Sequence, residues 1–117
     1  MPNIFSALHL YPINGVASRI ENDGTAWSYR DAKWAATIFA ADPEPANVDD
    51  QKAWVVDYWD AVHPHSAGGA YVNFMGDEGQ DRIKTAYRDN YPRLAEIKKR
   101  YDPDNLFRLN QNIKPAE

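Results

Sequence analysis

Hydrophobic residues in the first third of the chain occur in short runs of the length and spacing of β-strands. The run from Ile4 to Tyr11 is apolar on both faces of an extended chain, and Pro12 ends it. The run from Lys33 to Ala40 contains no breaker and includes large β-prone side chains, although its alanines leave a helix open. Both runs are therefore predicted to be strands.

A hairpin is predicted between these two runs. Val16–Ile20 and Thr25–Tyr29 are short β-prone pieces, and Asn22-Asp23-Gly24 between them is a strong turn sequence. Two extended pieces that flank such a turn are expected to pair with each other.

The spacing of apolar residues changes to that of a helix after the prolines at 43 and 45. Asn47 is a candidate cap, and Asp49 and Asp50 lie where the positive end of the helix dipole favours acids. The pattern predicts a helix that His63-Pro64 ends, with one apolar face buried, formed by Trp54, Val55, Tyr58, Trp59 and Val62.

The second half of the chain is predicted to contain a short strand and two helices. Ala70–Phe74 follows a glycine-containing loop and alternates so that Tyr71 and Asn73 share a face. A helix is expected from Gln80 to Arg88, and Pro92 favours a new helix from about Tyr91. The stripe of the second helix that is expected to face inward comprises Leu94, Ile97 and Tyr101, and the residues from Leu106 onward are expected to be extended coil.

Length and composition limit the fold to one domain. The chain has 117 residues, 44% of them hydrophobic and 13% aromatic, enough for one packed core. With the elements above, this predicts an α+β fold in which helices pack on one face of an antiparallel sheet. The other face is then available to a ligand.

Charge and local composition exclude several classes of function. The net charge of −4 argues against generic nucleic-acid binding. No apolar run approaches the roughly 18 residues of a membrane span, and the N-terminal stretch does not resemble a signal peptide. The absence of cysteine agrees with a cytoplasmic protein, which is the location we expect.

Most sequence signatures of a self-contained active site are absent. The chain has no glycine-rich phosphate loop, no nucleophile elbow and no cysteine-based metal spacing. His63-x-His65 is the only close histidine pair, and the intervening proline favours a loop over a metal site. The acidic pairs at 49–50 and 57–60 are better explained by a helix start and an exposed helix face. No metal ligand is predicted.

The C-terminal half carries a more specific signal. AYVNF is followed by AYRDNYPRLAEIKKRYDPDNLFRLNQNIKP. Over Tyr71–Asn73 and Asn90–Pro115 these residues resemble the berberine-bridge-type C-terminal segment of FAD-linked oxidases. Upstream, TAWSYRDAKW resembles the Thr-Ala-aromatic-x-x-Arg piece of the same family's substrate domain. The resemblance therefore divides the chain into residues 1–66, the end of a substrate-domain-like sheet with its covering helix, and residues 67–117, the berberine-bridge-like segment, the two forming one compact unit.

The resemblance implies a flavoenzyme whose FAD is held mainly by an N-terminal domain that this sequence lacks. It assigns Tyr71 to the substrate side as the catalytic residue, and Asn73, Asn110 and Asn112 to the cofactor. Gln111 belongs to the same returning segment, although a polar surface tail explains residues 110–112 equally well. Arg30 is interpreted as structural in preference to a substrate contact, and the position near Thr37, where relatives carry a base, holds no basic group.

The function expected from this resemblance is that of the substrate- and flavin-covering domain of an FAD-dependent oxidoreductase acting on a small molecule. The chain alone is not expected to be catalytic or to retain FAD, so a flavin-binding domain is the expected partner, supplied in trans or by a longer chain. Exposed aromatic residues such as Phe5, Tyr11 and Trp27 also favour a homo-oligomer. The alternative is a free-standing, non-catalytic α+β module that binds a partner or dimerises.

Overall fold

The computed structural model describes residues 2–117, which form two compact units. Unit 1 comprises the described residues up to Pro12 together with Trp34–Gly68. Unit 2 comprises Ile13–Lys33 and Gly69–Glu117. Each unit therefore joins two separate stretches of the sequence. The division of function at residues 66 and 67 stays a prediction.

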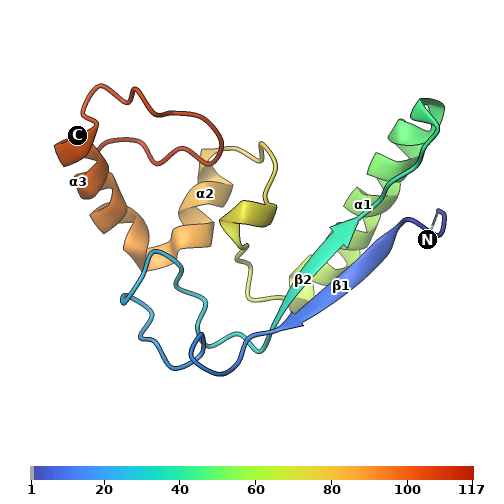
Figure 1. Ribbon diagram of the computed structural model, residues 1–117, viewed down its shortest axis with the longest axis horizontal. Helices are drawn as coiled ribbons and strands as arrows, with labels where there is room; N and C mark the ends of the chain where they lie inside the picture. The colour runs from blue at the N-terminus through green and yellow to red at the C-terminus, as the bar shows by residue number, and fades with distance from the viewer. Residues whose placement is uncertain (1) are drawn as a thin grey trace. The chain divides into compact units, whose positions relative to one another are not determined.

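Unit 1 contains the sheet. Strand β1 (Ala7–Pro12) pairs antiparallel with β2 (Trp34–Phe39), with Ala7 opposite Phe39 and Pro12 opposite Trp34 (Figure 1). Both strands fall within the apolar runs from which they were predicted. The antiparallel strand pair and the helices confirm the α+β class.

Helix α1 (Val48–Val62) contacts β2 and follows a short 3₁₀ helix, η1 (Pro45–Asn47). Asn47 makes no capping hydrogen bond, because the turn begins earlier and the Glu44 carboxylate accepts from the Ala46 N–H at 3.2 Å. The helix gives way to η2 (His63–His65), which contains the proline that was predicted to stop it.

The buried face of α1 is only partly the expected apolar stripe. The one α1 residue that is buried outright is Gln51, whose Oε1 accepts a hydrogen bond from Ser6 Oγ at 3.1 Å. Trp54 and Tyr58 are half-buried with their ring centroids 5.4 Å apart, whereas Trp59 stays 38% exposed. A polar contact therefore occupies the most buried position of the helix.

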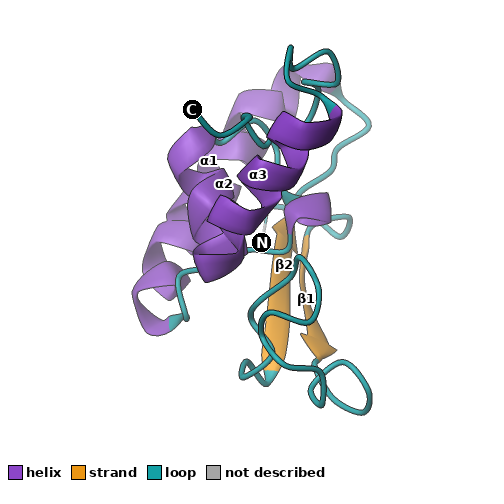
Figure 2. Ribbon diagram, turned by 90° about the vertical axis from the view of Figure 1, so that its left-hand side faces the viewer, coloured by secondary structure: helices purple, strands orange, loops and turns teal. Residues whose placement is uncertain are grey.

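The predicted hairpin in residues 16–29 is wrong. Residues 13–33 form neither helix nor strand (Figure 2), although the expected turn does form, with the Gly24 N–H donating to Glu21 O at 3.0 Å. The carbonyls of Asn22 and Thr25 accept hydrogen bonds from the side chain of Asn90, at 2.7 and 3.0 Å. Contacts to a residue far along the chain thus replace strand pairing.

The helices of unit 2 match the predictions closely. Helix α2 (Gln80–Tyr87) leads through η4 (Arg88–Asn90) into α3 (Tyr91–Tyr101), which has Pro92 in its first turn. Arg88 has a φ of 49°, and this left-handed backbone ends α2. The coil expected after residue 106 is also observed.

The inward-facing stripe predicted for α3 is largely wrong. Ile97 is 44% and Tyr101 74% exposed, and the buried residue of the helix is Ala95. The end of the chain packs on that side, since the Ala116 N–H donates to Ala95 O at 3.1 Å. The apolar stripe is therefore left uncovered by the described chain.

Within residues 2–117, no helix combines the length and apolar character that a membrane span requires. The cytoplasmic location stays a prediction.

Candidate functional site

The segment around Tyr71 forms a tight turn where a strand was predicted. Residues Val72–Phe74 make one turn of 3₁₀ helix, η3. The Phe74 N–H donates to Tyr71 O at 2.8 Å, and the Met75 N–H donates to Val72 O at 3.2 Å. The predicted strand at 70–74 is wrong because these backbone groups are satisfied locally and unit 2 offers no strand among its described residues with which to pair.

Tyr71 and Asn73 nevertheless come together. Asn73 Nδ2 donates a hydrogen bond to Tyr71 Oη at 2.8 Å. The predicted proximity is thus present, through a turn in place of a shared strand face. Because Tyr71 Oη accepts this hydrogen bond, its own proton remains available to a further acceptor.

Two aromatic rings surround the ring of Tyr71. The Trp27 centroid lies 6.5 Å away at an interplanar angle of 79°, and the Phe74 centroid lies 5.3 Å away at 83°. Both are edge-to-face arrangements, the favoured geometry for aromatic pairs. Tyr71 keeps 41% of its surface exposed, so the phenol is accessible to a ligand or a covering domain.

An open pocket of about 1030 Å³ lies beside this turn. Its lining includes Asn73, Asn110 and Asn112, the three residues assigned to the cofactor from the sequence. Tyr71 does not line it but is joined to it through Asn73. The structure therefore brings the four candidate residues to one place, while their chemical roles stay predictions.

Glutamine side chains hold the C-terminal segment in place as one wall of the pocket. Gln111 Nε2 donates to Met75 O at 2.7 Å and to Gly76 O at 3.0 Å, across to the loop after η3. Gln80 Nε2 donates to Asn112 O at 3.0 Å. Residues 110–112 are therefore anchored on both sides, which a free polar tail would not be.

The two asparagines of this wall differ in character. Asn110 has a φ of 57°, a left-handed conformation that asparagine tolerates better than most residues, and its carbonyl accepts from the Asn112 N–H at 2.9 Å. The backbone turn alone gives a reason for asparagine at position 110. Asn112 Oδ1, in contrast, is buried and has no hydrogen-bond partner.

Tyr87 is a pocket residue that sequence reasoning missed. It lines the pocket one helical turn after Ile83, and burial raises the pKa of its phenol above the ordinary value of 10.0. A phenol is neutral near pH 7 even at the ordinary pKa, so this hydroxyl can donate a hydrogen bond. The i, i+4 spacing of Ile83 and Tyr87 on α2 was the available signal.

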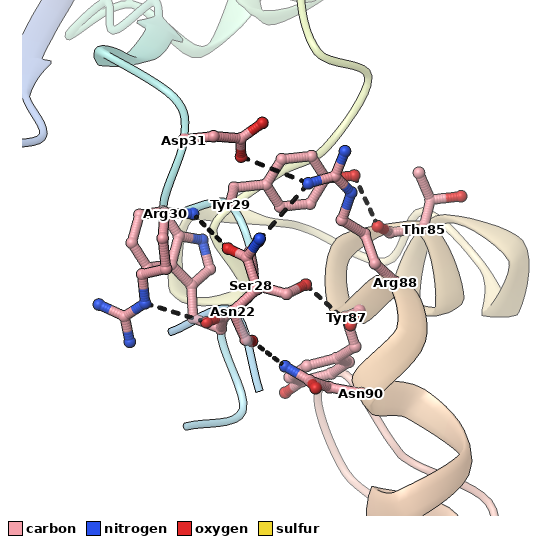
Figure 3. A network of polar contacts seen from close by, with 10 residues as sticks. Asn22, Ser28, Tyr29, Arg30, Asp31, Thr85, Tyr87, Arg88 and Asn90 are labelled. Atoms are coloured by element: carbon pink, nitrogen blue, oxygen red, sulfur yellow. Dashed lines mark hydrogen bonds and ion pairs between the residues drawn. The ribbon is translucent and has the colours of Figure 1, made fainter. Parts of the chain in front are cut away.

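Figure 3 shows a polar network that anchors the loop before Asp31 to α2 and η4. Tyr29 Oη donates to Thr85 O at 2.8 Å, and Ser28 Oγ donates to Tyr87 O at 3.0 Å. The guanidinium of Arg88 lies 4.2 Å from the Tyr29 ring centroid. Burial raises the pKa of the Tyr29 hydroxyl, an effect that Arg88 opposes.

Arg30 makes the contacts of a structural residue. It donates to Trp27 O at 3.2 Å and to Ala17 O at 2.9 Å, also bonds Thr25 Oγ1, and lies 4.7 Å from the Trp27 ring centroid. These contacts, mostly to backbone carbonyls, agree with the structural interpretation.

The structure describes Thr37 on β2 with its Oγ1 buried and without a hydrogen-bond partner. Across residues 2–117 no group of three His, Asp or Glu side chains is placed to hold a metal ion.

The chain is similar to known FAD-linked oxidoreductases. Residues 70–114 match the family model described as berberine and berberine like. The chain is 31% identical, over 97% of its length, to the FAD-linked oxidoreductase YgaK of Bacillus subtilis, and 33% identical over 87% to YvdP of the same organism. It is 25% identical over 96% to the aclacinomycin-N/aclacinomycin-A oxidase of Streptomyces galilaeus.

The matched region makes up 25%, 23% and 24% of these three relatives, so the chain spans about a quarter of their length. The match nevertheless covers nearly all of this chain, including Tyr71, Asn73 and the wall at 110–112. Over nearly its whole length the chain is therefore similar to one part of FAD-linked oxidoreductases, and its residues 70–114 match the berberine-like segment of that family.

Proposed function

We propose that this chain is the part of an FAD-dependent oxidoreductase that covers the flavin and contacts a small-molecule substrate. The observation that carries the proposal is the hydrogen bond from Asn73 Nδ2 to Tyr71 Oη at the edge of a pocket that also contains Asn110 and Asn112. The phenol of Tyr71 and the nearby side-chain amides are groups that can hydrogen-bond a substrate and a flavin edge.

The residues of the pocket fit the flavin ring of FAD but not its pyrophosphate. Side-chain amides offer both donors and acceptors, which complement the alternating carbonyls and N–H of a flavin ring, and the buried Asn112 Oδ1 lacks a donor. Arg108 is the single cation among the lining residues, and Asp77 offsets its charge. The pyrophosphate therefore needs a cradle supplied by a flavin-binding domain.

FAD, when bound, would supply the two-electron acceptor for oxidation of a substrate alcohol or amine carbon. In that reaction Tyr71 Oη would orient the substrate oxygen or nitrogen by a hydrogen bond, or receive its proton as a phenolate. Asn73 would hold Oη in place and stabilise negative charge on it. The pocket wall at 110–112 would keep the amides aligned.

Because the pocket does not fit the pyrophosphate of FAD, the expected partner is a flavin-binding domain. A flavin-binding domain, in trans or in a longer chain, would cover the residues that unit 2 leaves bare. Large apolar side chains in and after α3 are uncovered: Ile97 44%, Tyr101 74%, Leu106 72%, Phe107 78% and Leu109 85% exposed. Such an apolar surface is typical of an interface.

The same surface is the observation that favours the second candidate function, a non-catalytic module that binds a partner or forms a homodimer. The two candidate functions predict different results when a flavin-binding domain is added to the purified chain. If a flavin-binding domain is the partner, adding it yields a yellow complex and removes self-association seen by light scattering. If the chain is a dimerisation module, the dimer persists and no flavin is acquired.

The proposed role of Tyr71 is tested by the rate of flavin reduction in a complex that contains the flavin-binding domain. Tyr71→Phe should lower this rate by roughly 10²–10⁴, the range for a positioned proton-transfer group. Asn73→Ala should weaken flavin retention or shift its absorption spectrum. Tyr58→Phe is the matched control, because Tyr58 lies on α1 in unit 1 and is not among the residues that line the pocket.

An unchanged rate in Tyr71→Phe, with a lower melting temperature, would make Tyr71 a packing residue and refute its catalytic role.

A further inference from the structure

The ring of Tyr71 is held by contacts from two parts of the sequence. Phe74, from its own turn, and Trp27, from the irregular segment 13–33, both pack against it edge to face. Asn73 holds the hydroxyl. Of these three contacts, only that with Trp27 joins Tyr71 to a distant segment of the chain.

Trp27 is itself fixed in position. The Arg30 guanidinium lies over its ring at 4.7 Å, and Arg30 Nε donates to its carbonyl at 3.2 Å. Asn90, which is buried, donates to the carbonyls of Thr25 and Ala26 just before it, at 3.0 and 3.3 Å. The indole is therefore attached to α2–α3 through Asn90 and is not a freely moving loop side chain.

A phenol that is 41% exposed has the freedom to change rotamer unless neighbours restrict it. Phe74 and Asn73 belong to the same short turn as Tyr71 and move with it. The Trp27 contact also connects the ring to the segment whose carbonyls Asn90 holds. A misplacement of about 1 Å in a reacting group can cost a large factor in rate.

We propose that Trp27 is a positioning residue for Tyr71: its indole edge-to-face contact, held by Arg30, fixes the direction in which the phenol hydroxyl points at the substrate. The inference rests on the proposed function for the role of the hydroxyl. The packing itself does not depend on that role.

The packing is tested on the 117-residue chain by ¹⁹F NMR after incorporation of 3-fluorotyrosine. Tyr71→Phe, Tyr29→Phe and Tyr101→Phe assign the three signals needed. Trp27→Leu should move the Tyr71 signal most of the way to that of the exposed Tyr101, while Trp27→Phe, which keeps an aromatic edge, should largely retain it.

Two controls separate positioning from general damage. The Tyr29 signal reports the packed core of unit 2 and should not move in Trp27→Leu. Trp34→Leu removes an indole that is 59% exposed in unit 1 and should leave the Tyr71 signal in place. The inference is overturned if the Tyr71 signal does not shift in Trp27→Leu, or if Trp27→Phe shifts it as much as Trp27→Leu does. A shift of the Tyr29 signal in Trp27→Leu would also overturn it.

The functional consequence is measured in the complex with the flavin-binding domain. Trp27→Leu should lower the rate of flavin reduction about tenfold with little change in KM, and Trp27→Phe should restore most of it. If Tyr71→Phe lowers the rate of flavin reduction and Trp27→Leu does not, the positioning role of Trp27 is refuted and the catalytic role of Tyr71 stands. If Tyr71→Phe is as fast as the unmodified protein, the catalytic role of Tyr71 fails while the NMR result still decides the packing.

Discussion

Gly69→Ala should destabilise unit 2 more than any other single methyl group added at a glycine of this chain. A Cβ at position 69 would lie 1.9 Å from Tyr29 Cζ, and 2.2 and 2.4 Å from the two neighbouring ring carbons. Carbon atoms in contact normally lie about 3.5–4.0 Å apart. The Tyr29 ring would have to leave its place.

The cost follows from what holds that ring. Tyr29 is 6% exposed, its hydroxyl donates to Thr85 O at 2.8 Å, and Arg88 lies against one face. Overpacking of a core typically costs about 1–3 kcal/mol, and loss of the buried hydrogen bond adds about 1 kcal/mol. We expect Gly69→Ala to lower the free energy of unfolding by about 2–4 kcal/mol, which is roughly 10–20 °C in Tm for a domain of this size.

Urea unfolding followed by circular dichroism measures the loss, and hydrogen exchange locates it in unit 2. Gly76→Ala is the matched control, because its Cβ would meet nothing within 4 Å, and it should stay within about 0.5 kcal/mol. In a Tyr29→Ala background, which removes the ring, the Gly69→Ala penalty should largely disappear. An undiminished penalty there, or a Tm within about 2 °C of the unmodified chain, would refute the reasoning.

Three further predictions concern the polar contacts. Asn90→Ala removes the donor to the Asn22 and Thr25 carbonyls and should cost about 1–3 kcal/mol, with faster amide exchange in residues 22–27. The hydrogen bond from Lys98 lowers the pKa of Asp102, so this carboxylate stabilises the fold above the unfolded value near 4 and the gain is lost as the pH falls below it. Asp102→Asn should abolish this acid dependence, measured as exchange of the Leu106 and Phe107 amides that Asp102 binds. Burial raises the pKa of Tyr87, so stability should fall above about pH 10 and Tyr87→Phe should reduce that fall.

The elements that could be predicted from the sequence are those with local causes. The strands at residues 7–12 and 34–39 and the three helices follow from apolar spacing and from prolines at helix starts and stops. The strand at 70–74 failed because its backbone bonds close a turn within five residues. Alternation of apolar and polar side chains does not distinguish such a turn from a short strand.

The hairpin failed for a reason that lies far away in the sequence. A single amide, Asn90 Nδ2, donates to the Asn22, Thr25 and Ala26 carbonyls, separated from it by 68, 65 and 64 positions. Nothing in the sequence around the turn indicates that these carbonyls have partners elsewhere. The turn was predicted correctly, and the strand pairing was not.

The candidate site shows the same division. Family resemblance identified Tyr71, Asn73, Asn110 and Asn112, whereas Tyr87 and the anchoring role of Gln111 emerged only from the fold. Gln111 lies in a polar segment that has the composition of a surface tail. Its anchoring role depends on the carbonyls of Met75 and Gly76, which accept from its side chain. Those carbonyls lie in the loop after η3, and the Gly76 carbonyl also accepts from the Glu78 N–H at 3.1 Å.

In unit 2, side-chain amides satisfy main-chain carbonyls that strand pairing satisfies in unit 1. Asn90, Gln80 and Gln111 each donate to main-chain carbonyls of segments without regular structure, and such carbonyls need partners when they leave water. The arrangement makes the site sensitive to the donor and not to the shape of the side chain. Gln111→Glu keeps the length of the side chain but replaces the donor with a charged acceptor that the two carbonyls repel. The pocket wall should then detach from the loop at 75–76. An aliphatic side chain of similar size at position 111 should weaken this contact less, because it removes the donor without adding repulsion.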